Sequence, residues 1–143
     1  MVFYVDSCIY LNLWKKEEGL HGQKFWKYAE SFFEKSKNQF IYYSGFVLKE
    51  LENVLTSKDF AAKRRIFNKP FFVRVMPIQN DYDEARILEV IANFEISFFD
   101  CLHIILTRKI NAILITRDRK LIDFAKRYCK VARPEELQAV YFI

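Results

Sequence analysis

The chain has 143 residues, of which 52% are hydrophobic and 29% charged, so a single domain with a sizeable core is expected. This composition excludes an intrinsically disordered chain, and the low content of three Gly and three Pro favours regular elements with short connections. The formal net charge of +5 favours a polyanionic partner such as nucleic acid.

The cysteines exclude a disulfide-stapled domain. Cys8, Cys101 and Cys129 are odd in number and widely spaced, and with the two histidines they form no zinc-binding pattern. The sequence contains no signal peptide and no apolar run long enough to cross a bilayer. We therefore expect a cytoplasmic protein with no membrane partner, folded as one domain over residues 1–143.

The first half of the chain alternates short apolar strands with amphipathic helices. Residues 2–6 form a buried strand that ends in an acid, and helices are expected over residues 8–16 and 24–36. Residues 39–44 form a second strand, and Ser44 can cap the helix that follows. The expected inward stripe of that helix is Val47, Leu51, Val54 and Leu55.

The second half continues the alternation. Its expected elements are a basic helix (58–68), a strand (70–78), a helix (81–94), a helix starting at Ser97, a strand (111–116), a helix (118–129) and a candidate fifth strand (130–134). Strands separated by helices predict a three-layer α/β/α fold with a central, mainly parallel sheet of four to five strands. Ligand sites in such folds form at the carboxyl ends of the strands.

Four carboxylates are expected at that edge of the sheet. Asp6 ends the first strand and Asp118 follows the fourth, while Asp100 lies in the first turn of the helix before the fourth strand. Glu50 lies on the inward side of the helix after the second strand. Converging carboxylates repel one another unless a cation neutralises them, and oxygen ligands suit Mg²⁺ or Mn²⁺. Such an ion can activate water for hydrolysis of a phosphodiester.

Each acid also has a purely structural interpretation. Asp118 can cap the helix after it, and Asp100 fits a capping box with Ser97. Glu52 competes with Glu50, but the apolar stripe of their helix favours Glu50 as the inward residue. Taken together, the four positions favour a metal site over independent structural roles.

Several side chains near these acids have more than one candidate role. His103 shares a helix face with Asp100. It either helps to hold the site or contacts substrate, or it is a half-buried histidine bonded to backbone, and we favour the last of these. Arg117 and Arg119 flank Asp118 and are candidates for phosphate contacts. The aromatic stripe of the 24–36 helix is core or a dimer surface, and a homodimer is expected.

Four segments that span nearly the whole chain carry a recognisable pattern. They are "FYVDSCIYLNLW", "SGFVLKELENVL", "FDCLHIILTRKINAILITRDRKLIDFAKR" and "ARPEEL". Together they resemble the PIN domain family. The resemblance implies a parallel α/β fold and a nuclease that depends on Mg²⁺ or Mn²⁺ and acts mostly on RNA. Many PIN domains are VapC-type toxins of prokaryotic toxin–antitoxin pairs, so the resemblance also implies an RNA substrate and an antitoxin partner.

The resemblance assigns roles to individual residues. It implies that Asp6, Glu50 and Asp100 are metal ligands and that Asp118 is the fourth acid, often acting through water. Supporting hydroxyls flank these ligands at Ser7 and Thr116. Many members carry a further Asp where this chain has Lys120, so Asp118 is expected to fill that role alone.

Two other functions are compatible with parts of the pattern. A phospho-acceptor receiver domain also gathers acids at the carboxyl edge of a parallel sheet, but it needs adjacent acids after the first strand, where "VFYVDSC" supplies one. A catalytically silent PIN-like scaffold that binds RNA or protein would share the fold without the reaction.

Overall fold

A five-stranded parallel sheet forms the centre of the computed structural model, which describes residues 1–137. Residues 138–143 of the predicted domain lie outside the described residues. The strands are β1 (Val2–Val5), β2 (Phe40–Tyr43), β3 (Phe72–Arg74), β4 (Ile113–Ile115) and β5 (Lys130–Ala132). Their order is β3-β2-β1-β4-β5, which confirms the predicted parallel α/β sheet.

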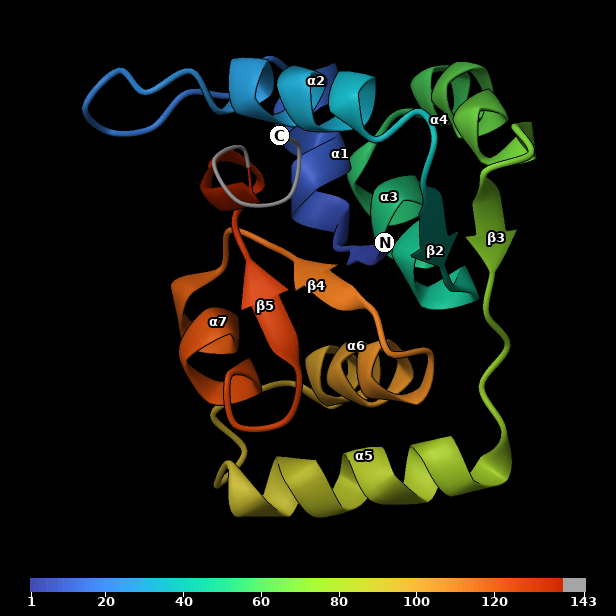
Figure 1. The fold of residues 1–143 in the computed structure, drawn as a ribbon, viewed down its shortest axis with the longest axis vertical. Coiled ribbons are helices and arrows are strands. Elements are labelled where there is room, and N and C mark those ends of the chain that lie inside the picture. Colours follow the sequence, from blue (N-terminus) through green and yellow to red (C-terminus); the bar gives the residue numbers. More distant parts are fainter. Residues whose placement is uncertain (138–143) are drawn as a thin grey trace.

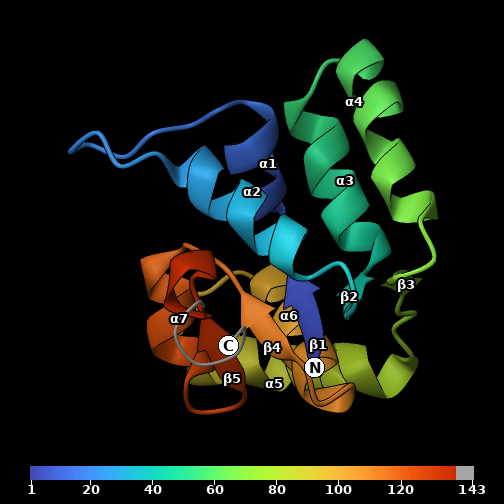
Figure 2. The ribbon, with the colours of Figure 1, turned by 45° about the horizontal axis from the view of Figure 1, so that its top comes forward.

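Helices cover both faces of the sheet and complete the three layers (Figures 1 and 2). One layer holds α1 (Ser7–Trp14), α2 (Phe25–Lys35), α3 (Gly45–Val54), α4 (Ser57–Lys63) and the 3₁₀ segment η1 (Arg64–Asn68). The other holds α5 (Gln79–Ile91), α6 (Phe98–Lys109) and α7 (Arg119–Ala125). A second 3₁₀ segment, η2 (Pro134–Leu137), follows β5. No helix in the described part of the chain is long and apolar enough to span a membrane.

The central strand β1 sets the position of the site. Phe3, Tyr4 and Val5 are fully buried, because β1 pairs with β2 on one side and β4 on the other while helices cover both faces. The backbone N–H of Asp6 continues the ladder by donating to the Ile115 carbonyl at 2.9 Å. The chain then turns directly into α1, so the Asp6 side chain remains at the carboxyl edge of the sheet.

Three expectations about individual elements are wrong in detail. The strand predicted over residues 70–78 is only Phe72–Arg74, because β3 is an edge strand and the chain leaves the sheet before Pro77, which has no N–H to donate. The predicted basic helix divides into α4 and η1 at Lys63. The side chain of Val54 is 51% exposed because α3 ends there, and half-buried Leu55, in extended backbone, packs on the core instead.

Candidate metal centre

Asp6 joins the carboxyl ends of β1 and β4. Its side chain caps α1, with Oδ1 accepting the Ser7 N–H at 2.8 Å, and Oδ2 accepts the Thr116 hydroxyl at 2.8 Å. The Cys8 thiol approaches the same Oδ2 at 3.5 Å. Only 5% of Asp6 is exposed, so this carboxylate is buried but well supplied with donors.

Glu50 reaches the same place from the middle of α3. Its Oε2 accepts the Ser7 hydroxyl at 2.6 Å, and its Oε1 is 2.8 Å from Nε2 of His103. The competing acid Glu52 is exposed and lies 3.5 Å from the Lys49 ammonium. Glu50 rather than Glu52 therefore faces Asp6, as the apolar stripe suggested.

His103 belongs to a buried chain of side-chain hydrogen bonds. Its Nδ1 is 2.6 Å from the Tyr4 hydroxyl, which is 2.7 Å from the Ser44 hydroxyl. Tyr4, Ser44 and His103 are all 0% exposed. The expectation of a half-buried histidine bonded to backbone is therefore wrong: the ring is fully buried and both ring nitrogens meet side chains.

Tyr4 was not singled out from the sequence, where it reads as one more apolar residue of the first strand. The available signal was general: a buried tyrosine hydroxyl usually needs a hydrogen-bond partner. Ser44 occupies the expected N-cap position of α3 but makes no side-chain cap bond, because its hydroxyl is directed to Tyr4.

Asp100 lies in the first turn of α6, where its N–H donates to the Ser97 hydroxyl at 3.1 Å. Among residues 1–137, no group donates a hydrogen bond to the Asp100 carboxylate. Burial and the negative charges of Asp6, Glu50 and Asp118 raise the pKa of Asp100 to about 6, against an opposing contribution from His103. The other three predicted acids therefore act electrostatically on Asp100.

Glu50 and His103 stabilise each other's charged forms. Burial disfavours the charge on Glu50, but the hydrogen bond and charge of His103, with the Ser7 hydroxyl, outweigh it and lower the pKa of Glu50. Burial likewise disfavours protonated His103, yet the bond to Glu50 and the charges of nearby acids raise the pKa of His103. Glu50 is thus an ionised acceptor at neutral pH.

Asp118 and the two arginines lie at the start of α7. Exposed Asp118 caps that helix through Oδ1, which accepts the Leu121 N–H at 3.3 Å. Arg117 forms two 2.8 Å contacts with Glu135, packs over Phe25 and is 12% exposed in its side chain. Arg119 is exposed and makes no ion pair within the described part of the chain.

The carboxylates at this edge fit a hard divalent cation. An oxygen of Asp6, an oxygen of Glu50 and a ring nitrogen of His103 lie within 4.8 Å of one another. Asp100 adds a carboxylate that accepts no hydrogen bond from the described residues and whose pKa is raised by burial and neighbouring negative charges. Carboxylate oxygens of this kind are the ligands that Mg²⁺ and Mn²⁺ prefer.

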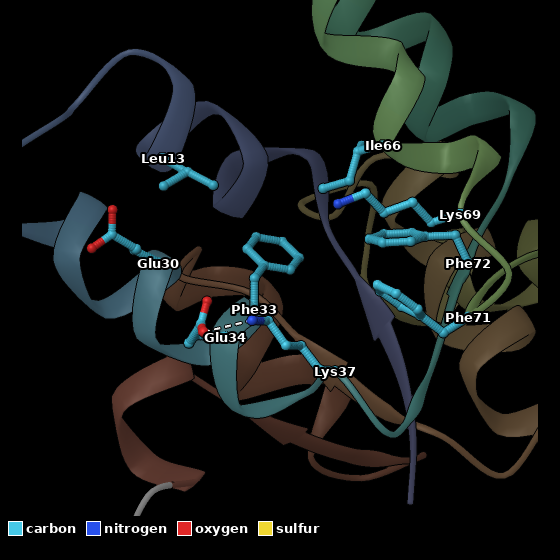
Figure 3. A pocket seen from close by; sticks show the side chains of 9 residues that line it. All are labelled: Leu13, Glu30, Phe33, Glu34, Lys37, Ile66, Lys69, Phe71 and Phe72. Atoms are coloured by element: carbon cyan, nitrogen blue, oxygen red, sulfur yellow. Dashed lines mark hydrogen bonds and ion pairs between the residues drawn. The ribbon is translucent and has the colours of Figure 1, made fainter.

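A hollow elsewhere on the molecule is separate from these acids. A pocket of about 250 Å³ lies between α2 and the η1–β3 segment. Figure 3 shows the aromatic and charged side chains that line it. It is lined by Leu13, Glu30, Phe33, Glu34, Lys37, Ile66, Lys69, Phe71 and Phe72. None of the site residues predicted from the sequence is among them, so the site is defined by its chemistry rather than by this pocket.

Comparisons with known proteins bear on the family and the fold of the chain. A family model described as the PIN domain matches residues 3–127, whereas the curated proteins give no match. Among solved structures, Mycobacterium tuberculosis VapC20, described as a sarcin–ricin loop cleaving toxin, is similar with a TM-score of 0.71 and 19% identity, over 92% of this chain and 99% of that chain.

Two further structures have the same fold. VapBC2 from Rickettsia felis, bound to a DNA fragment from its promoter, has a TM-score of 0.65 and 20% identity over 93% of this chain and 98% of that chain. FitAcB from Neisseria gonorrhoeae has a TM-score of 0.64 and 14% identity over 96% of this chain and 100% of that chain. At these identities the likeness shows a shared fold.

Proposed function

Because the chain belongs to the PIN domain family, whose members are typically nucleases, we propose that it is a Mg²⁺- or Mn²⁺-dependent endoribonuclease. The observation that carries the proposal is the close approach of Asp6 and Glu50 at one edge of the sheet, beside Asp100, whose pKa their negative charges help to raise. The family match leaves no place for the receiver-domain alternative.

The acids have distinct roles in this proposal. Asp6, Glu50 and Asp100 hold the ion, and Asp118 holds a second ion or orients the attacking water. A bound divalent ion supplies a more acidic water and stabilises negative charge on the phosphate. Ser7 and Thr116 hold the Glu50 and Asp6 carboxylates by the hydrogen bonds described above.

The two arginines differ as phosphate ligands. Arg119 is exposed beside Asp118 and is free to contact an RNA phosphate. Arg117 is engaged by Glu135 through both terminal nitrogens, so it reaches a phosphate only by giving up that pair. We therefore assign the larger share of phosphate binding to Arg119.

We further propose that the nuclease is the cytoplasmic toxin of a toxin–antitoxin pair and forms a homodimer. Similarity to VapC20, described as a toxin, and to VapBC2 supports the toxin assignment. Coexpression with the product of a neighbouring small gene, followed by affinity purification, is expected to yield a stable complex that suppresses RNA cleavage.

Light scattering on the isolated protein tests the proposed homodimer and is expected to give twice the chain mass.

Cleavage of single-stranded RNA in Mn²⁺ tests the nuclease. Asp100→Asn is expected to reduce cleavage to background, whereas Asp123→Asn is expected to leave it unchanged, because the Asp123 side chain is 63% exposed and pairs only loosely with Lys126 at 3.8 Å. Equal cleavage by wild type and Asp100→Asn would contradict the assignment. A wild-type protein that binds RNA without cleaving it would instead support the silent scaffold.

A further inference from the structure

We propose that His103, held by Tyr4, is a positioning residue that fixes the Glu50 carboxylate in the metal site. The inference rests on the proposed function, because it assigns a purpose to a buried hydrogen-bond chain behind the metal ligands. That chain consists of Ser44, Tyr4, His103 and Glu50, and is called the Tyr4–His103 relay below.

The relay connects the elements that carry the three acids. Tyr4 lies on β1, two residues before Asp6, and His103 lies on α6, one turn after Asp100. Ser44 is the N-cap residue of α3, the helix that carries Glu50. Hydrogen bonds of 2.6–2.8 Å along this path fix the relative positions of all three elements at the edge where the acids meet.

The direction of donation decides between a positioning role and direct metal ligation. The ionised Glu50 carboxylate can only accept, so Nε2 of His103 must carry the hydrogen at their 2.8 Å contact. A ring nitrogen that carries a hydrogen has no lone pair for a metal. In the neutral ring Nδ1 then accepts from the Tyr4 hydroxyl, which in turn accepts from Ser44. If the ring is protonated, Tyr4 accepts from Nδ1 and donates to Ser44, and Nε2–H still faces Glu50.

The hydroxyl of Ser44 is used for the relay and does not cap its helix. A serine at an N-cap typically stabilises a helix by about 1 kcal/mol when its hydroxyl caps a backbone N–H. Here the hydroxyl makes no such bond and meets Tyr4 at 2.7 Å instead. Every hydroxyl and ring nitrogen of the relay is paired and belongs to a residue that is 0% exposed, so Glu50 receives a donor whose position is fixed.

Tyr4→Phe breaks the relay without touching a proposed ligand. It keeps the buried ring but leaves Nδ1 of His103 without its hydrogen-bond partner, so the imidazole loses the contact that fixes its orientation and Nε2–H is no longer held toward Glu50. Tyr10→Phe is the matched control: Tyr10 is also 0% exposed, and its hydroxyl has no hydrogen-bond partner among the described residues.

The experiment measures Mn²⁺ affinity by isothermal titration calorimetry on metal-free proteins shown to be folded by circular dichroism. Tyr4→Phe is expected to weaken Mn²⁺ binding by about 10- to 100-fold, as loss of a ligand's outer hydrogen-bond partner does in other metal sites. Tyr10→Phe is expected to bind as wild type does. Saturating Mn²⁺ is expected to restore RNA cleavage by Tyr4→Phe, which a general loss of structure would not allow.

If Tyr4→Phe does not fold, Ser44→Ala tests the relay at its other end, with Ser36→Ala as control. Ser36 is also fully buried, but its hydroxyl donates to the Phe32 carbonyl, away from the acids. Ser44→Ala is expected to weaken Mn²⁺ binding several-fold and Ser36→Ala to leave it unchanged. If the relay variant that folds binds Mn²⁺ with the affinity of the wild-type protein, this inference alone is overturned. If the wild-type protein itself binds no Mn²⁺, both the relay and the metal site are overturned.

Discussion

The acids of the site differ in how much of their charge the protein compensates. Asp6 receives a backbone N–H and a hydroxyl, and Glu50 receives a hydroxyl and an imidazole. Asp100 receives no donor from the described residues, although three other acids act on it. A bound dication would therefore relieve Asp100 more than the other two, which identifies it as the most informative acid to remove.

The metal-free protein is expected to be more stable without the Asp100 charge. The pKa of Asp100 is raised from 3.8 to about 6 in the folded protein. The stabilising contribution of the protonated carboxyl is therefore complete below about pH 4 and is lost as the pH rises through about 6. In EDTA at pH 8, Asp100→Asn is expected to raise the free energy of unfolding by roughly 1–2 kcal/mol, with a much smaller gain at pH 4.5. Urea denaturation at both pH values measures the free energy of unfolding. If the variant is less stable than the wild-type protein at pH 8, the charge of Asp100 does not destabilise the metal-free fold.

Glu50 and Glu52 offer a matched pair on one helix. Glu50→Gln removes a proposed ligand charge and is expected to weaken Mn²⁺ binding by at least about tenfold and to abolish RNA cleavage at limiting Mn²⁺. Glu52→Gln removes an exposed acid beside Lys49 and is expected to change neither quantity. Calorimetry and a cleavage assay on both variants measure the difference, and equal effects would exclude a special role for Glu50.

At the scale of residues, the sequence predicted the acids better than the groups that hold them. Asp6 and Asp100 could be placed because strand ends and helix starts are readable from local patterns. The Tyr4–His103 bond links residues 99 positions apart, and it depends on strand register and on the rotation of α6. Neither quantity is encoded in any local pattern, so the relay became visible only in the structure.

At the scale of elements, hydrophobic periodicity predicted the alternation of strands and helices and the parallel sheet. The periodicity did not predict the length or the type of an element where contacts with neighbouring elements determine it. The strand β3 is short because it lies at the sheet edge, and the basic helix changes to 3₁₀ geometry after Lys63. Arg117, a candidate for phosphate contact, joins the β4–α7 connection to η2 through Glu135, a partner 18 residues away that no local pattern indicates.

The Arg117–Glu135 pair is expected to stabilise the fold. Burial disfavours the charge on Glu135, but the hydrogen bonds and charge of Arg117 outweigh it and lower the pKa of Glu135 below 4.5. Such a group contributes stability above its ordinary pKa, and that contribution is lost as the pH falls through the lower folded-state value. Glu135→Gln is expected to cost roughly 1 kcal/mol at pH 7 and almost nothing near pH 3. Thermal melts across this range test it, and a cost that does not change with pH would exclude the ion pair as its source.

At the scale of the whole molecule, the net charge of +5 suits an RNA ligand but does not locate the contact. The salt dependence of binding locates it, because each neutralised phosphate of a single strand contributes about 0.7 to the log–log slope. In EDTA, Arg119→Ala is expected to lower the slope by about that amount. Arg65→Ala, an exposed arginine on η1, is expected to leave the slope unchanged. Fluorescence anisotropy at several salt concentrations gives both slopes, and identical slopes for wild type and Arg119→Ala would remove Arg119 from the interface.

The central claim concerns a single place where acids from distant parts of the chain share one ion. Anomalous diffraction from a crystal soaked in Mn²⁺ locates such an ion directly. The account predicts an anomalous peak at the carboxyl edge of β1, with oxygens of Asp6, Glu50 and Asp100 within about 2.0–2.5 Å of it. A crystal with no peak there, or with Mn²⁺ bound only at exposed acids elsewhere, would contradict it.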